Sequence, residues 1–224
     1  MSYIIKFQIL SLLLVAIPGH ILANFDCQTN LKPKGQELLE LQRTYDGLKT
    51  FSADFQQKSY LSTLGVEEVS SGKLWVESPG KTKWSYSIPE KIEYLIKDKS
   101  FWHYQATISQ LQVTDLDKSN LSALPTDLLT GQVNFSNSFN LSLLCLNSQD
   151  RKVLTLLPKT EDFAVENVKL LLENQRIAAI EFIDYSGNVN SLELSAVDWN
   201  PQIGDEVFSI DYPKETFLND TRNQ

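Results

Sequence analysis

Residues 82–104 read TKWSYSIPEKIEYLIKDKSFWHY, and this stretch decides the fold. Large apolar side chains fall at every second position in three runs, which short turns separate at Pro89-Glu90 and at residues 97–100. The alternating residues are Trp84, Tyr86, Ile88, Ile92, Tyr94, Ile96, Trp102 and Tyr104. A period of two is typical of strands with one buried face. Because turns this short join antiparallel neighbours, the stretch predicts three strands of a meander.

Similar runs continue the pattern on both sides of this stretch. They comprise residues 51–55 and 74–76 before it, and 111–113, 139–144, 153–157, 163–172, 177–183, 191–197 and 207–212 after it. Polar turns such as Ser186-Gly187-Asn188 separate the runs. The sequence therefore predicts a mainly β protein with about eleven antiparallel strands.

Two segments have the three-and-four spacing of apolar residues that is typical of a helix. In residues 31–48 the apolar stripe comprises Leu38, Leu41, Tyr45 and Leu48. In residues 122–129 it comprises Leu124, Leu128 and Leu129, and Ser122 is a candidate cap for this second helix. Two helices supply too little area to cover one apolar face of so long a sheet. The sheet either folds into a two-layer sandwich or stays open and holds a ligand. Because no repeat or linker interrupts the pattern, residues 24–224 are expected to form one domain.

The first residues have the layout of a secretory signal peptide. Lys6 precedes an apolar run over residues 7–17, Pro18-Gly19 ends the run, and Ala23 offers a cleavage site. We expect residues 1–23 to be removed. Cys27 follows Asn-Phe-Asp rather than the small residue that precedes a lipidated cysteine, so lipidation is not expected. In an oxidising compartment Cys27 and Cys145 are candidates for one disulfide, and two unpaired thiols are the alternative.

Composition excludes several kinds of chemistry. Lys and Arg number 20 against 28 Asp and Glu, which gives a net charge of −8 and argues against a nucleic-acid partner. His103 is the only histidine after residue 23, and the alternation predicts that it points away from the face of Trp102 and Tyr104. No cluster of His and Cys has the spacing of a zinc site. We therefore expect no catalytic residue, metal or cofactor.

Ordered motifs along the chain resemble one known family. They are FSADFQQK at residues 51–58, GKLWV at 72–76, PGKTKWSY at 79–86, FWHY at 101–104, LPTDLL at 124–129, LTLLP at 154–158 and VFSIDYP at 207–213. The chain resembles the outer-membrane lipoprotein carrier protein (LolA) family, the periplasmic lipoprotein chaperones of Gram-negative bacteria. The resemblance extends over nearly the whole chain after the signal peptide, in the same order.

The resemblance implies an unclosed half-barrel of about eleven antiparallel strands, with an α-helical lid over the concave apolar face. It implies a monomeric periplasmic carrier that takes the acyl chains of lipoproteins from an inner-membrane ABC transporter to an outer-membrane receptor. Three alternatives stay open: a receptor of the same fold, a domain that senses lipoproteins or peptides, and a periplasmic hydrolase. A receptor of this kind requires a lipidated cysteine.

The resemblance and the alternation together give a set of candidate site residues. The cavity is predicted to be lined by Phe55, Leu74, Val76, Trp84, Tyr86, Tyr94, Trp102 and Tyr104, and the lid to contribute Leu38, Leu41, Leu124, Leu128 and Leu129. Plain core packing is the alternative for each of them. The chain departs from the family pattern at Ser78, where Arg is usual, and at Thr82, where Phe is common. We therefore expect the lid either to close through different contacts or to close more loosely.

Overall fold

The computed structural model describes residues 23–118 and 124–222. Its strands are β1 (Thr29–Asn30), β2 (Thr50–Leu61), β3 (Val66–Glu77), β4 (Lys81–Ile88), β5 (Ile92–Lys97), β6 (Ser100–Gln105), β7 (Gln110–Asp115), β8 (Phe139–Leu146), β9 (Lys152–Pro158), β10 (Val165–Glu173), β11 (Arg176–Asp184), β12 (Val189–Trp199) and β13 (Phe217–Asp220). Its helices are α1 (Glu37–Tyr45), α2 (Leu124–Thr130) and α3 (Phe135–Ser138), with 3-10 turns η1 (Leu116–Lys118), η2 (Glu161–Phe163) and η3 (Asp205–Phe208).

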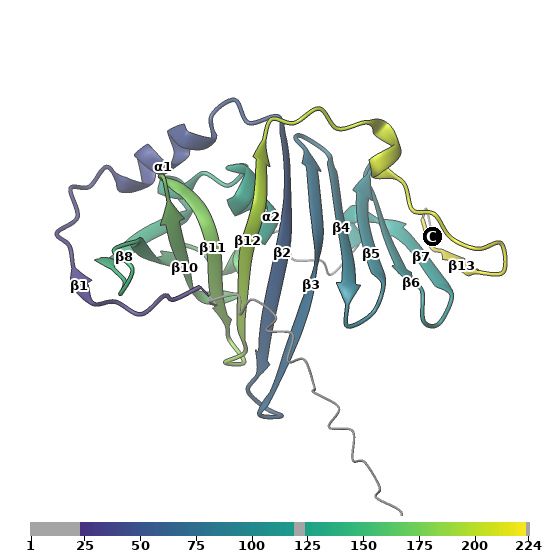
Figure 1. Ribbon diagram of the computed structural model, residues 1–224, viewed down its shortest axis with the longest axis horizontal. Helices are drawn as coiled ribbons and strands as arrows, with labels where there is room; N and C mark the ends of the chain where they lie inside the picture. Colours follow the sequence, from purple (N-terminus) through teal and green to yellow (C-terminus); the bar gives the residue numbers. More distant parts are fainter. Residues whose placement is uncertain (1–22, 119–123, 223–224) are drawn as a thin grey trace, which may run out of the picture.

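All of these strands form a single sheet, in the order β1-β8-β9-β10-β11-β12-β2-β3-β4-β5-β6-β7-β13. Neighbours are antiparallel except β7 and β13, which are parallel. The sheet does not close, because β1 and β13 lie at opposite ends of the order (Figure 1). The prediction of a mainly β, unclosed half-barrel is confirmed, and the two-layer sandwich is excluded.

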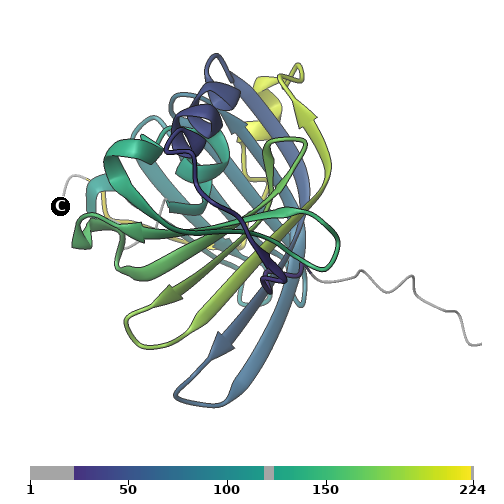
Figure 2. The same ribbon diagram turned by 90° about the vertical axis from the view of Figure 1, so that its left-hand side faces the viewer.

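The helices lie on the concave side of the curved sheet (Figure 2). Helix α1 is shorter than the predicted 31–48, because Gly35 and Gly47 flank it with φ angles of +82°. Helix α2 begins at Leu124, and the predicted cap Ser122 lies outside the described residues. The sequence did not predict α3, whose cap is the Asn134 side chain accepting a hydrogen bond from the backbone N–H of Asn137.

The main core lies between the helices and the concave face. Pairing places Ala53 beside Leu74 and Leu74 beside Trp84, so these side chains share one face. The fully buried members of this core include Phe51, Leu74, Leu128, Leu129, Phe135, Leu156, Val168, Leu170 and Ile180. The helices therefore cover the apolar face across β2–β4 and β8–β12.

A second, smaller core lies on the opposite, convex face of the sheet. Trp102 pairs with Leu95, and Tyr104 pairs with Glu93, so both point away from the face that carries Tyr94. Tyr104, Leu111 and Val113 form this core, with Trp102 and Ile210 packed against it. The prediction that Trp102 and Tyr104 line the cavity is therefore wrong, and His103 lies on the concave face instead.

The C-terminal segment covers this part of the convex face. The predicted strand at 207–212 is wrong: the segment begins as η3 and continues without strand pairing. Phe208 is buried, and the Lys83 ammonium donates a hydrogen bond to the Ser209 carbonyl at 2.7 Å. The alternation at 207–212 thus reflects packing across the sheet rather than pairing within it.

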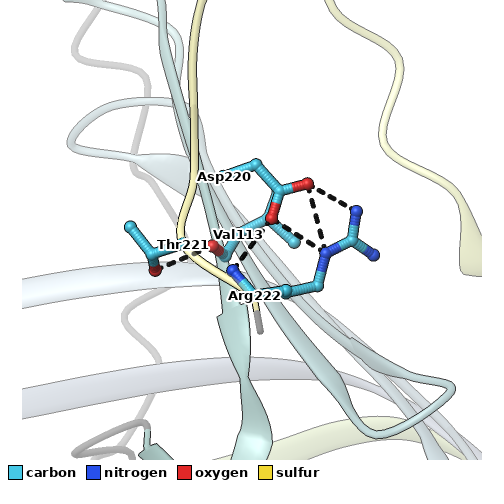
Figure 3. A network of polar contacts seen from close by, with 4 residues as sticks. All are labelled: Val113, Asp220, Thr221 and Arg222. Carbon is cyan, nitrogen blue, oxygen red and sulfur yellow. Dashed lines mark hydrogen bonds and ion pairs between the residues drawn. The ribbon is translucent and has the colours of Figure 1, made fainter. Parts of the chain in front are cut away.

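A small polar network holds residues 220–222 (Figure 3). Arg222 Nε donates to the Asp220 carboxylate at 2.9 Å, and Thr221 Oγ1 donates to the Val113 carbonyl at 3.2 Å. The Arg222 guanidinium lies 5.2 Å above the Trp102 ring. These contacts hold β13, which the sequence did not predict, along β7.

The N-terminal segment runs along the convex side of β8–β11. Phe25 is buried there against Val153 and Leu171. A disulfide joins Cys27 to Cys145, with 5.6 Å between the Cα atoms. In residues 23–118 and 124–222, no helix is long and apolar enough to cross a membrane.

Candidate functional site: an apolar cavity beneath the helical lid

A cavity of about 220 Å³ lies between α2 and strands β2, β4, β5, β11 and β12. It is lined by Gln57, Trp84, Tyr86, Tyr94, Ile96, Pro125, Thr126, Phe182, Asn190, Ser191 and Leu192. Strand residues therefore form its floor, and Pro125 and Thr126 of α2 form its cover. The volume is below the range of about 300–1,000 Å³ that is usual for ligand pockets.

The predicted cavity residues divide into three groups. Trp84, Tyr86 and Tyr94 line the cavity. Phe55, Leu74 and Val76 lie on the same face, but they are buried in the main core beneath the helices. Trp102 and Tyr104 lie on the other face, as described above. The structure thus brings together six of the eight predicted side chains on one surface, with three of them at the cavity itself.

The predicted lid residues lie mainly in the core rather than at the cavity. Leu41, Leu128 and Leu129 are buried there, and Leu38 is half-buried against it. Leu124 is the first residue of α2. Leucines from both helices therefore pack directly on the concave face.

A few polar contacts connect the lid to the sheet and to α1. Trp84 Nε1 donates to Thr126 Oγ1 at 3.3 Å. Gln42 bridges α1 to the segment after α2, since its amide donates to the Gly131 carbonyl at 3.0 Å and accepts from the Phe135 N–H at 3.1 Å. Gln132 donates to Ser78 Oγ at 3.3 Å. The residue in place of the family's usual Arg thus still contacts the lid region, and buried Thr82 lies opposite Ile96.

Aromatic rings form a continuous row across the concave face. The Phe55 ring lies 4.9 Å from the rings of both Trp84 and Tyr86, and Tyr86 lies 5.7 Å from Tyr94. His103 extends the row, with its ring centroid 4.8 Å from that of Tyr94. Burial lowers the pKa of His103 below its usual value. The imidazole ring thus extends the aromatic surface.

The floor of the cavity also carries polar side chains that the sequence did not single out. The Tyr86 hydroxyl donates to Gln57 Oε1 at 2.8 Å, and burial raises the Tyr86 pKa. A further pocket of about 580 Å³ shares Gln57, Tyr86 and Tyr94 with the cavity and opens beyond them. Asn190 was missed because a lone polar residue in a strand pattern has no recognisable motif.

Metal ligation has no support in the described part of the chain, where no group of three or more His, Cys, Asp or Glu could hold an ion. The Nε2 atom of His103 is buried and has no hydrogen-bond partner among these residues. The cavity surface is therefore one that can bind apolar groups through contact area, with a few hydrogen-bonding side chains at one end.

An unclosed antiparallel sheet with a helical lid over an apolar cavity defines the class of protein, a lidded half-barrel. The chain belongs to the LolA family: the family described as "Outer membrane lipoprotein carrier protein LolA" matches residues 46–211. The resemblance carried by the sequence motifs is thereby confirmed.

Relatives in this family are similar over most of the chain. The outer-membrane lipoprotein carrier protein of Nitrosomonas europaea is 25% identical over 189 residues, covering 84% of this chain and 91% of that protein. The protein of the same name from Chromohalobacter salexigens is 23% identical over 169 residues, covering 75% and 80%. A solved structure of an uncharacterized conserved protein from Thermus thermophilus has a TM-score of 0.52 at 13% identity, covering 84% of this chain and 99% of that one. That last similarity shows the fold alone.

Proposed function

We propose that this protein is a periplasmic carrier that binds the acyl chains of lipoproteins beneath its lid. It receives them from an inner-membrane ABC transporter and delivers them to an outer-membrane receptor. A signal peptide over residues 1–23 would direct it to the periplasm. The observation that carries the proposal is the cavity, where a helix covers an aromatic apolar floor in a sheet that never closes.

The size of the cavity supports a lid that opens. A volume of about 220 Å³ holds only part of one acyl chain, so a lipoprotein would have to displace the helices. The lid leucines Leu128 and Leu129 pack on the same apolar face as Phe55 and Leu74. Acyl chains can replace these leucines as the cover of that face. The described arrangement then corresponds to the carrier without cargo.

The energetics suit reversible transport. Burying an acyl chain contributes about 0.8 kcal/mol per CH₂ group, so about ten buried groups contribute roughly 8 kcal/mol. This corresponds to a dissociation constant in the micromolar range. Displacing buried leucines from the concave face opposes binding, which keeps the affinity from becoming too high for release.

Cys27 bears on the receptor alternative. A lipid-anchored receptor needs its cysteine sulfur in a thioether to the lipid, and the Cys27 sulfur is bonded to Cys145. The same sulfur cannot form both bonds. This favours the carrier over the receptor.

A release assay tests the proposal. Vesicles of inner membrane containing the transporter and a lipoprotein would be incubated with the protein, and soluble lipoprotein complex would be measured. Ile96→Glu places a charge at the cavity and should abolish complex formation, since a carboxylate among acyl chains is costly.

Ile108→Glu is the matched control, because Ile108 is 59% exposed in the turn between β6 and β7. It should release as much lipoprotein as the unchanged protein. Equal release by Ile96→Glu, with the protein folded, would exclude the cavity as the binding site. No release by the unchanged protein would exclude the carrier function.

A further inference from the structure

A row of hydrogen-bonded side chains crosses the concave face at one end of the cavity. It consists of Tyr86, Gln57, Ser59 and Asn190, which we call the polar belt. The Tyr86 hydroxyl donates to Gln57 Oε1 at 2.8 Å, Gln57 Nε2 donates to Ser59 Oγ at 3.2 Å, and Ser59 Oγ donates to Asn190 Oδ1 at 2.8 Å. The belt thus connects β4, β2 and β12.

Packing alone does not account for the polar belt. Amide groups on an otherwise apolar surface lose free energy of hydration, which hydrogen bonds only partly restore. Apolar side chains at residues 57 and 190 would extend the surface formed by Phe55 and Leu192. The belt therefore weakens the site as a binder of plain hydrocarbon and suits a ligand that also has polar atoms at this depth.

The polar belt retains unused donors. Gln57 Nε2 has two N–H groups and uses one of them for Ser59. Within the part of the chain that the structure describes, Asn190 Nδ2 donates no side-chain hydrogen bond, and Asn190 accepts from Ser59 through Oδ1. Both residues are half-buried and line the cavity. The belt thus offers N–H donors to an acceptor that enters from the cavity.

The polar belt also marks a boundary between two spaces. Gln57 and Tyr86 line both the apolar cavity of about 220 Å³ and the more open pocket of about 580 Å³. The larger pocket is lined by Glu68 and Glu90 together with apolar residues such as Val69, Ile88 and Ile92, whereas the described residues that line the smaller cavity include no carboxylate. A ligand with an apolar tail and a polar head would place its linkage between the two parts at the belt.

We propose that the polar belt binds the carbonyl oxygens of ester- or amide-linked acyl chains, through the free N–H groups of Gln57 and Asn190. The acyl tails lie in the cavity, and the polar remainder of the molecule lies in the larger pocket. This inference rests on the proposed function. It adds that the carrier recognises the linkage as well as the hydrocarbon, so that an acylated ligand binds in a fixed orientation.

Matched lipopeptides test the proposal. One carries two hexadecanoyl chains on glycerol through esters, and the other carries hexadecyl chains through ethers, which lack carbonyl groups. Binding is measured by displacement of a bound anilinonaphthalene sulfonate probe. We expect the unchanged protein to bind the ester form about tenfold more tightly, because the ether form cannot accept the hydrogen bonds that Gln57 and Asn190 would donate. The double variant Gln57→Leu/Asn190→Leu should bind both forms equally.

Gln56→Leu is the control, because Gln56 neighbours Gln57 on the same strand and faces the convex side. It should keep the tenfold preference. Urea titration shows whether the double variant is folded. If it is not, the single variant Asn190→Leu is used, and it should reduce the preference for the ester form to about threefold. Ester and ether phosphatidylglycerol, tested in parallel, show whether the belt accepts any acyl ester or only the lipopeptide.

A preference for esters that persists in the leucine variants would overturn the role of the polar belt. Equal binding of ester and ether forms by the unchanged protein would overturn it as well. Failure of the unchanged protein to bind either lipopeptide would instead contradict the proposed function. The two failures are therefore distinguishable.

Discussion

Gly131 ends α2 with a φ of +67°, and a Cβ atom at this residue would lie 2.4 Å from Tyr45 Cβ. Gly131→Ala should lower the free energy of unfolding by about 2–4 kcal/mol, because it adds overpacking to an unfavourable backbone conformation. Urea unfolding measures the loss. Gly65→Ala has a similar φ of +64° and no atom within 4 Å, so it should cost only about 1 kcal/mol. Equal losses for the two variants would show that the clash between the added Cβ atom and Tyr45 does not contribute.

His103 predicts a dependence of stability on pH. Burial lowers its pKa from 6.5, so near and below that pH the unfolded chain binds a proton that the folded chain resists. Stability that is present at pH 7.5 should therefore decline as the pH falls through about 6.5. The free energy of unfolding, measured between about pH 7.5 and 5.5, should fall more steeply than in His103→Gln. Parallel curves for the two proteins would contradict this.

The faces of the sheet on which the β6 side chains lie could not be predicted from the sequence. Along this strand, Phe101 and His103 point to one face, and Trp102 and Tyr104 point to the other. Because both faces carry aromatic rings, periodicity alone cannot decide which of them is concave. The sequence favours Trp102 and Tyr104 for the concave face only because that face is expected to hold the core. The decisive contact is with Ile210, far along the chain. No local pattern contains that information.

Among the elements, α1 is hydrogen-bonded to the segment after α2 through the side chain of Gln42. Gln42→Leu removes the hydrogen bonds to Gly131 and Phe135 and leaves the Phe135 N–H without its partner. We expect a loss of about 1–3 kcal/mol in the free energy of unfolding. Amide hydrogens of residues 131–138 should exchange faster, since the lid opens more often.

Arg43→Gln is the control for this helix, because Arg43 is exposed on α1 and both residues are good helix formers. It should leave exchange in residues 131–138 unchanged. If Gln42→Leu also leaves it unchanged, the two helices are coupled through packing rather than through Gln42.

Elements were predictable where local pattern and tertiary contact agree. The apolar stripe of α1 and the alternation of β4 each face the main core, so the pattern predicted both type and side. The segment at 207–212 alternates in the same way, yet Phe208 and Ile210 pack across the sheet. Periodicity reports which side chains are covered, and it does not report whether the backbone pairs. The four residues of β13 are too few to show a period.

For the whole molecule, the cover of the convex face should contribute much of the stability. Phe208 is 1% exposed and packs where Lys81 lies 5.5 Å from its ring centroid, whereas Phe217 is 66% exposed. Phe208→Ala should cost about 3–5 kcal/mol by leaving a cavity. Phe217→Ala should stay within about 0.5 kcal/mol. Chemical denaturation of both variants checks this, and similar losses would mean that burial of Phe208 contributes little.

The disulfide joins the N-terminal segment to β8 across 118 residues of sequence. Replacing Cys27 and Cys145 by serine should lower the free energy of unfolding by about 2–5 kcal/mol, since the unfolded chain regains conformational freedom. Denaturation of the double variant and of the unchanged protein, each with and without reductant, measures the effect. Only the unchanged protein should respond to reductant. A variant as stable as the oxidised protein would contradict this.

The lengths of the two outermost strands bear on aggregation. A half-barrel leaves two rows of backbone donors and acceptors open, and such rows can recruit strands from other copies and start a fibre. Here one border ends in the two residues of β1 and the other in the four residues of β13. Strands so short offer little template to a second chain, although β1 pairs only with Cys145 and Leu146 of β8. Neither of these two terminal strands gives a second copy of the chain a long edge on which to add a strand.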